Sequence, residues 1–356
     1  MKKVWIVLLC LLMITGCSSS KSDENEKSST DTSSTDSLDN SFYPMVNLGS
    51  NLVRENFYQN FYSSQDFQTI GRELQIIATE HFSTSDYYMS EGLQLVQTDK
   101  DKLLRWSSDP QKYPYSLQPE EGSALSNVPN HLMVENIYEQ DLYKKNGSDY
   151  KLSGMAIALV IDPTGKSKDD SRLADDVIES YSQQIIEKMN KYLQSKKKLK
   201  DIPVIIAVYS QNVDSESSYN GKFIYSSYST GGKVGQISAL DYDTFVFTSD
   251  EANNEDEATS SQFSVFKNNL KNASTDSVGV IGYGRYRNNT IQSLKIQLTL
   301  SVKSYTELIY LVELAADEID SRFTGFDCYA IVNDQDGLKA VIIKKAGESA
   351  QSTLLY

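Results

Sequence analysis

Apolar residues recur along the middle of the chain in patterns that change from strand to helix and back to strand. Met155 to Ile161 is a continuous apolar run, which is typical of a strand buried on both faces. Leu173 to Leu193 repeats apolar residues at three- and four-residue spacing, so this segment is predicted to form an amphipathic helix. Val204 to Tyr209 is predicted to be a second buried strand, and Gly221 to Tyr228 a more polar strand after a turn. The pattern therefore predicts one strand–helix–strand–strand unit.

The same order of patterns returns nearer the C-terminus. Leu294 to Val302 alternates apolar and polar residues as a strand does, and Ser304-Tyr-Thr-Glu307 is a capping box that opens a helix ending near Gly325. Phe326 to Val332 and Leu338 to Lys344 follow as two strands joined by a turn. The recurrence predicts an α+β protein built from two tandem repeated strand–helix–strand–strand units. Their sheets are expected to be mixed or antiparallel, with helices packed on one face.

The N-terminal segment has the pattern of a processing signal. Lys2 and Lys3 precede an apolar run from Val4 to Ile14, which is too short to cross ~30 Å of hydrocarbon as a helix but suits a signal peptide. Small residues then lead to Gly16-Cys17, the pattern of a lipobox, in which signal peptidase II cuts before a cysteine that carries diacylglycerol. The alternative is an ordinary secretory signal followed by a chance cysteine. We interpret 1–16 as a lipoprotein signal peptide, Gly16 and Cys17 as the cleavage boundary, and Cys17 as the lipid attachment site.

The remaining chain divides by composition. Residues 17–41 are rich in Ser, Thr and Asp, and such a segment cannot repay the entropy of ordering, so it is expected to be a tether. A first α+β domain is expected over 42–250 and a second over 260–356, joined by the acidic segment 250–259. The predicted location is the extracytoplasmic face of the cell membrane, where acylated Cys17 inserts into the lipid bilayer.

Composition excludes several classes of function. The chain has 356 residues, a formal net charge of -14, two histidines and three cysteines. A strongly acidic chain has no electrostatic attraction for nucleic acid. Two histidines cannot build a three-histidine zinc centre, and three cysteines cannot hold an iron–sulfur cluster with four thiolates. No metal or other cofactor is therefore predicted.

The residues that enzymes commonly use are scattered, and no catalytic residue is predicted. His81 and His131 lack a second ligand or nucleophile nearby in sequence, and Cys328 lies in an apolar context that favours a buried thiol. Gly282-Tyr-Gly284 lacks the third glycine of a dinucleotide-binding loop. The acidic residues around Asp241 and Glu255 lack the glycine and terminal glutamate of a calcium loop, so they are expected to be solvated.

One short segment is a weak candidate for ligand binding. Tyr283, Arg285, Tyr286 and Arg287 place two guanidinium groups between aromatic rings, which could clamp an anionic or sugar ligand. The alternative is a strand edge with solvated arginines. The identity of any ligand stays open at this stage.

Five segments carry a family resemblance in one order. They are Glu91-Gly-Leu-Gln94, Leu103-Leu-Arg-Trp106, Tyr115-Ser-Leu-Gln-Pro119, Glu139-Gln-Asp-Leu-Tyr143 and Leu152-Ser-Gly-Met-Ala-Ile-Ala-Leu159. With the two repeats, the chain resembles the CamS family of lipoproteins, the sex-pheromone precursors of low-GC Gram-positive bacteria. The resemblance implies two α+β repeat domains on a lipid anchor, with no established catalysis. It also implies that a short hydrophobic peptide from the end of the signal sequence, here Leu9 to Gly16, is released and sensed by plasmid-bearing enterococci.

These observations favour a non-enzymatic surface lipoprotein whose folded domains bind a protein partner or a component of the cell envelope. Two alternatives remain. One is the solute-binding lipoprotein of an uptake system, and the other is an envelope hydrolase that uses carboxylates alone.

Overall fold

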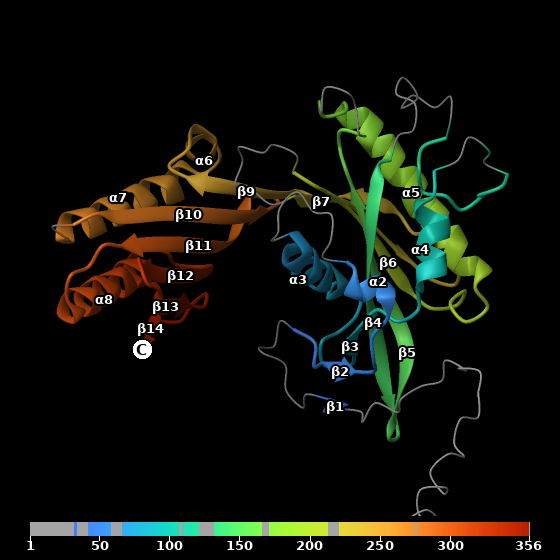
Figure 1. Ribbon diagram of the computed structural model, residues 1–356, viewed down its shortest axis with the longest axis horizontal. Coiled ribbons are helices and arrows are strands. Elements are labelled where there is room, and N and C mark those ends of the chain that lie inside the picture. Colours follow the sequence, from blue (N-terminus) through green and yellow to red (C-terminus); the bar gives the residue numbers. More distant parts are fainter. Residues whose placement is uncertain are drawn as a thin grey trace, which may run out of the picture.

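Two six-stranded sheets, each covered by helices, make up the folded part of the chain (Figure 1). The computed structural model describes residues 32–33, 42–57, 66–106, 109, 111–120, 132–165, 171–212, 221–274 and 276–355. Gly16, Cys17, His131 and the segment Leu9 to Gly16 lie outside the described residues, as does most of the predicted tether.

The first sheet has the strand order β3-β4-β5-β6-β7-β8, and only the β5–β6 pair is parallel. A short pair of strands, β1 (Thr32–Ser33) and β2 (Val46–Asn47), lies beside it. The elements of this unit are α2 (Leu52–Glu55), α3 (Asp66–Ala78), β3 (Tyr88–Glu91), α4 (Gln97–Leu104), β4 (Val134–Asn146), β5 (Asp149–Ile161), α5 (Asp175–Ser195), β6 (Val204–Ser210), β7 (Lys222–Ser229) and β8 (Ile237–Ala239).

The second sheet has the strand order β9-β10-β11-β12-β13-β14, and again only one pair, β11–β12, is parallel. Its elements are β9 (Tyr242–Phe247), α6 (Asp250–Glu255), α7 (Glu257–Ala273), β10 (Val278–Arg287), β11 (Thr290–Leu300), α8 (Tyr305–Arg322), β12 (Asp327–Asp334), β13 (Gly337–Lys344) and β14 (Gln351–Leu354).

The two sheets match strand by strand. In each, the parallel pair is the third and fourth strand and is joined by a long helix, α5 in one and α8 in the other. In each, another helix, α4 or α7, lies between the first and second strands in the sequence. The prediction of two tandem α+β units is therefore confirmed, and the repeat extends to all six strands of each sheet.

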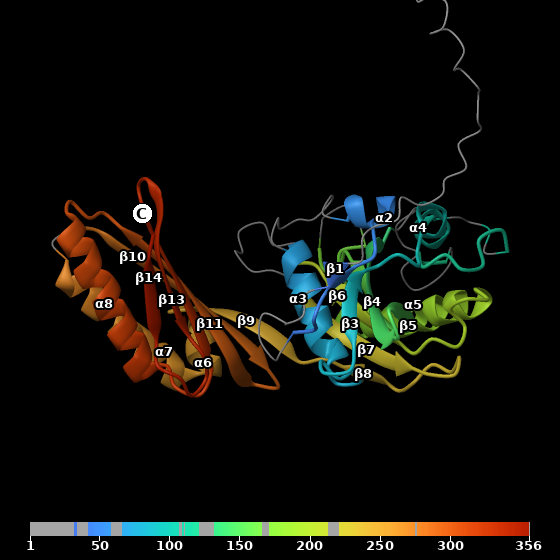
Figure 2. The ribbon, with the colours of Figure 1, turned by 90° about the horizontal axis from the view of Figure 1, so that it is seen from below.

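The units differ in how many faces their helices cover. On β5, Met155, Ile157 and Leu159 face the core under α4 and α5, whereas Ala156 and Ala158 face a separate core under α3. The first sheet is therefore covered on both faces. No helix in the described part of the second unit corresponds to α3. In the second unit α7 and α8 cover one face, as predicted, and that core includes Cys328. Figure 2 shows α3 as the first-unit helix on the side toward the second unit.

The connection between the sheets is short and lies earlier than the acidic segment that was expected to join them. Only Leu240 and Asp241 separate β8 from β9, and β9 pairs with β10 in the second sheet. Residues 250–259 instead form α6 and the start of α7. Ser249 and Asp256 cap these helices, accepting hydrogen bonds from the backbone amides of Ala252 and Thr259. Acidic residues suit these positions because a helix N-terminus carries partial positive charge.

Within the described ranges, no helix is both long enough and apolar enough to pass through a membrane.

Candidate functional site

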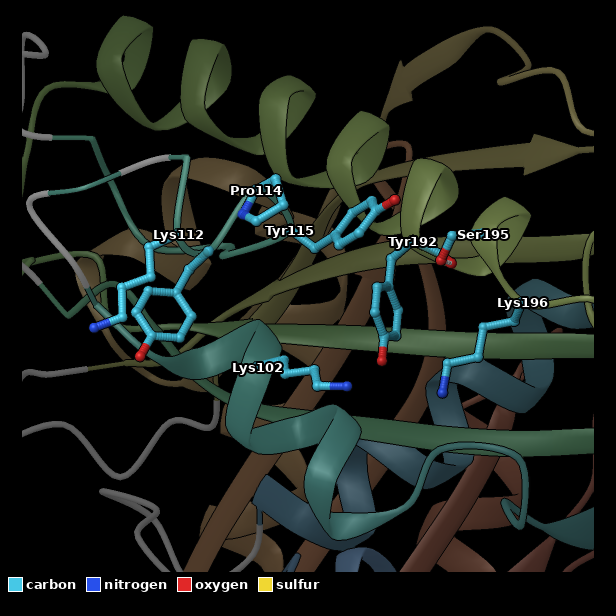
Figure 3. A pocket seen from close by; sticks show the side chains of 8 residues that line it. Lys102, Lys112, Pro114, Tyr115, Tyr192, Ser195 and Lys196 are labelled. Atoms are coloured by element: carbon cyan, nitrogen blue, oxygen red, sulfur yellow. Dashed lines mark hydrogen bonds between the residues drawn. The ribbon is translucent and has the colours of Figure 1, made fainter.

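A cavity lined by lysines and tyrosines opens on the side of the first sheet that α4 and α5 cover (Figure 3). It lies between α4, the end of α5 and the loop at 112–115, and its volume is about 420 Å³. This is within the range of small-molecule sites. We call it the Lys/Tyr pocket; its lining residues are Lys102, Lys112, Tyr113, Pro114, Tyr115, Tyr192, Ser195 and Lys196.

Tyr192 fixes the floor of this pocket. The amphipathic pattern of α5 buries Tyr192 together with Leu193 and Met189 in the core beneath the helix. Tyr115 packs edge-on against Tyr192, with ring centroids 5.2 Å apart. Figure 3 shows Tyr192 projecting from α5 toward α4, with Lys196 beside it. The two rings therefore offer a rigid aromatic surface to a ligand.

A buried carboxylate below the pocket balances one lysine. Asp99 accepts a hydrogen bond from the Tyr192 hydroxyl at 2.6 Å and forms an ion pair with Lys196. Burial by itself raises the pKa of Asp99, but hydrogen bonds from Lys196, Tyr192 and the Val96 amide outweigh it, and the pKa lies below its usual value. Asp99 is therefore ionised at neutral pH and holds Lys196 against the aromatic floor, 5.1 Å from the Tyr192 ring.

Positive charge also surrounds the pocket mouth. Arg105 donates a hydrogen bond to the Tyr113 hydroxyl at 3.3 Å, and Arg105 and Lys112 each lie 5.5 Å from the centre of the Tyr113 ring. The hydrogen bond from Arg105 is the main reason why the pKa of Tyr113 is lowered. Among the described residues, no carboxylate forms an ion pair with Lys102 or Lys112. The mouth can therefore attract an anion although the whole chain is acidic.

The predicted ligand residues on β10 lie elsewhere, and the strand divides them between its two faces. Tyr286 points into the core and donates a hydrogen bond to Asp256 at 2.9 Å. Arg285 and Arg287 lie on the opposite face and form ion pairs with Glu73 of α3 and with Glu80. The arginines thus tie the second unit to the first, and Tyr283 is half-buried on their face of the strand. Their role in ligand binding stays a prediction.

The other candidate residues from the sequence make packing or ion-pair contacts. Cys328 is fully buried, and burial raises its pKa to about 12. Gly282 leaves room for the ring of Phe263, since a Cβ there would lie 2.4 Å from it. Asp243 forms an ion pair with Lys222. His81 is exposed and stacks on Tyr228, with ring centroids 4.0 Å apart.

Two of the segments that carry the family resemblance meet in space. The loop after β3 donates its Leu93, Gln94 and Leu95 amides to two buried carboxylates of β4, Glu139 and Asp141. A Cβ at position 92 would lie 2.4 Å from the Glu139 side chain, so only glycine allows this close approach. The segments Glu91–Gln94 and Glu139–Tyr143 therefore form one buried polar cluster.

The Lys/Tyr pocket was missed in the sequence because three separate segments build it. Lys102 belongs to α4, Tyr113 and Tyr115 to a loop, and Tyr192 and Lys196 to the end of α5. The only local signals were the Tyr113-Pro-Tyr115 sequence and the lysine run at 196–198. Neither shows by itself that the segments converge.

The chain matches one family model and is similar in structure to solved proteins. Residues 51–350 match the family model described as CamS sex pheromone cAM373 precursor. The sex pheromone precursor of Lactobacillus salivarius is similar in structure, with a TM-score of 0.77 and 21% identity over 91% of this chain and 99% of that one. The C-terminal domain of the sex pheromone staph-cAM373 precursor of Staphylococcus aureus gives 0.68 and 20%, over 84% of this chain and 99% of that one.

These structural likenesses are low in identity and show a shared fold. None of the curated proteins compared matches the chain. The family model, however, spans most of the sequence, and the resemblance inferred from the sequence motifs is thereby confirmed. The chain belongs to the CamS family of sex pheromone precursors.

Proposed function

We propose that the folded part of this protein is a non-catalytic binding module, anchored by lipid on the outer face of the cell membrane, that captures an anionic ligand. The observation that carries the proposal is the Lys/Tyr pocket. Two lysines that pair with no carboxylate of the described residues flank an aromatic floor, so the pocket suits a phosphate or carboxylate group attached to a sugar or other small ring. Such groups are common in envelope polymers.

Binding of defined probes tests this assignment. We would titrate the unlipidated chain that starts at residue 17, with Cys17→Ala, with glycerol 3-phosphate, N-acetylmuramic acid and uncharged N-acetylglucosamine. We expect the anionic probes to bind, and we expect the Lys102→Gln/Lys112→Gln double variant to bind them more weakly. Lys271→Gln, at an exposed position of α7, is the control and should bind them as the parent does. Equal binding by the double variant and the parent would contradict the pocket assignment.

The anchor rests on the sequence of the leader. Lys2, the apolar run to Ile14 and Gly16-Cys17 occur in the order that lipoprotein processing requires. A single residue then attaches the protein to the bilayer, because the acidic chain is repelled by anionic lipid. Cys17→Ala should move the protein from the membrane fraction to the medium. A variant that stays in the membrane fraction would show that something other than Cys17 retains it.

A hydrolase would have to show turnover. If the unlipidated chain degraded peptidoglycan or teichoic acid, and one Asp or Glu substitution abolished this activity without unfolding the protein, the non-catalytic assignment would be overturned. Transport assays of a strain lacking the protein would likewise distinguish a solute receptor, since uptake of one solute would fall.

Family membership supports a second function that belongs to the leader and not to the folded part. We propose that cleavage before Cys17 followed by membrane proteolysis releases Leu9–Gly16 as a signalling peptide. The synthetic octapeptide should induce aggregation in plasmid-bearing enterococci at low concentration. A scrambled octapeptide of the same composition serves as the control, and equal responses to both would refute the proposal.

A further inference from the structure

The second cavity of interest lies where the two units meet. Its volume is about 450 Å³, and both units contribute to its lining. The first unit contributes the residues after α3, strand β7 and the edge strand β8. The second unit contributes the end of β10 and the turn that follows it. We call it the junction cleft. It is separate from the Lys/Tyr pocket, because Tyr228 in its wall packs against the core on the α3 side of the sheet.

An aromatic platform forms part of this wall. The rings of His81 and Tyr228 are nearly parallel, with an interplanar angle of 6°. Phe82 holds Tyr228 from the side, in an edge-on contact at 5.8 Å. The platform is therefore fixed by buried packing, while His81 itself is exposed.

Neutral polar side chains make up half of the remaining described lining. Ser226 of β7 lies directly opposite Ser238 of β8 in the strand register, and Gln236 and Asn288 add side-chain amides. Hydroxyl and amide groups both donate and accept hydrogen bonds. The cleft can therefore pair with a ligand whose own polar groups do both.

The charged groups of the cleft nearly cancel. Glu80 and Arg287 form an ion pair across the junction, which leaves Asp241 as the one further carboxylate among the described lining residues. Arg287 is also held against the Tyr242 ring, 5.5 Å from its centre. This balance distinguishes the junction cleft from the positively charged mouth of the Lys/Tyr pocket.

We propose that the junction cleft binds a neutral saccharide unit. A sugar ring has an apolar C–H face that packs on an aromatic ring, and hydroxyl groups at its rim that donate and accept hydrogen bonds. The His81–Tyr228 platform matches the first feature, and Ser226, Ser238 and the nearby amides match the second. Both units line the cleft, so a bound saccharide bridges them. The Glu80–Arg287 ion pair holds the two sides of the site in position.

Saturation-transfer NMR and calorimetry with defined oligosaccharides test the proposal. The probes are the N-acetylglucosamine trimer and maltotriose, with choline as a cationic comparison, added to the unlipidated chain from residue 17 with Cys17→Ala. At least one neutral trisaccharide should bind saturably. The exposed position of His81 allows His81→Ala without a change of fold, and this variant should weaken binding about tenfold, the effect of losing roughly 1.4 kcal/mol of stacking.

Matched variants make the test specific. His81→Phe keeps the stacked ring and should retain binding, and Ser226→Ala/Ser238→Ala should weaken it without altering the circular dichroism spectrum. Ser352→Ala, an exposed serine on β14, is the control and should change nothing. The proposal is overturned if neither trisaccharide binds, if choline alone binds, or if His81→Ala binds as well as the parent chain. The Lys102→Gln/Lys112→Gln variant, judged separately with anionic probes, reports on the Lys/Tyr pocket independently.

Discussion

Glu139 and Asp141, two residues apart on β4, are buried carboxylates that one loop holds together: the Leu95 amide donates to Glu139 and the Leu93 amide to Asp141. Asp141 accepts hydrogen bonds at Oδ2 from the Leu93 amide, from Gln94 Nε2 and from the Tyr143 hydroxyl. Its Oδ1 is buried and has no hydrogen-bond donor among the described residues unless Glu139 carries a proton. Burial and the charge of Asp141 raise the pKa of Glu139 well above its usual value, so the folded state binds a proton at this pair more tightly than the unfolded chain does.

This proton makes stability depend on pH. A carboxyl group whose pKa is higher in the folded state binds its proton more tightly there, so the free energy of unfolding falls as pH rises from about 4.3 toward the raised pKa. Asp141→Asn would place an amide donor where Oδ1 now lacks one and remove the neighbouring charge. We expect the free energy of unfolding of this variant to fall less than that of the parent between pH ~4.5 and ~7.5. Urea unfolding at several pH values measures the difference.

Glu313→Gln is the control for that experiment, since Glu313 is exposed on α8. It removes one carboxylate from the same chain and should leave the pH profile of stability unchanged. An Asp141→Asn profile that coincides with the parent profile would show that Asp141 does not raise the pKa of Glu139.

The ion pair between Glu73 and Arg285 links the units at a partly buried position. Glu73 is buried, and its Oε2 has no hydrogen-bond partner among the described residues. Arg285→Met should therefore cost about 3 kcal/mol, because it leaves a buried carboxylate without its cation. The Glu73→Met/Arg285→Met double variant should recover most of this loss, since it removes both charges. Urea unfolding of the four chains in a double-mutant cycle gives the coupling energy.

An exposed pair provides the comparison. Arg172 and Asp175 also form an ion pair, but their side chains are 47% and 89% exposed. Arg172→Met should change the free energy of unfolding by less than about 1 kcal/mol. If Arg285→Met were equally mild, Arg285 would not be the group that stabilises the Glu73 carboxylate.

Two glycines of β10 should respond differently to an added methyl group. At Gly282 a Cβ would lie 2.4 Å from the Phe263 ring, which packs against Phe247, Phe266 and Phe323. Gly282→Ala should destabilise the second unit by about 1–3 kcal/mol, the usual cost of overpacking a core. At Gly279 the nearest atom, in Thr299, is 3.4 Å away, so Gly279→Ala should have little effect. Thermal unfolding that shifted equally in both variants would contradict the packing argument.

Cys328 should be unreactive until the second unit opens. Its thiol is buried, and burial raises its pKa to about 12, so little thiolate forms at pH ~8. In the unlipidated Cys17→Ala chain, which starts after Cys10, Cys328 is the one remaining cysteine. Labelling with a thiol reagent should therefore be slow in buffer and fast in denaturant. Fast labelling in buffer, with the fold intact, would show that the thiol is accessible.

The sequence by itself determined the elements and their repetition. The apolar run at 155–161 and the period of 173–193 are local signals. They identified α5 to within two residues at each end, and the second half of β5, which begins at Asp149. The same signals located β11, α8 and the two strands that follow, so the tandem α+β architecture could be predicted. The predicted leader and the predicted lipid attachment at Cys17 also rest on a local pattern, because processing enzymes of this kind recognise a short segment before folding.

Only the tertiary structure decided how these elements share surfaces. The sequence pattern did not show that α3 covers the second face of the first sheet, since the face that a helix covers depends on chain connections. Arg285 and Arg287 were weak candidates for ligand binding beside the alternative of solvated arginines. Their placement beside Glu73 and Glu80 depends on the two-residue link between β8 and β9. The Lys/Tyr pocket and the junction cleft likewise bring together side chains from distant segments. Periodicity records which face of its own element a residue occupies, whereas these sites depend on strand order and on the packing of separate elements.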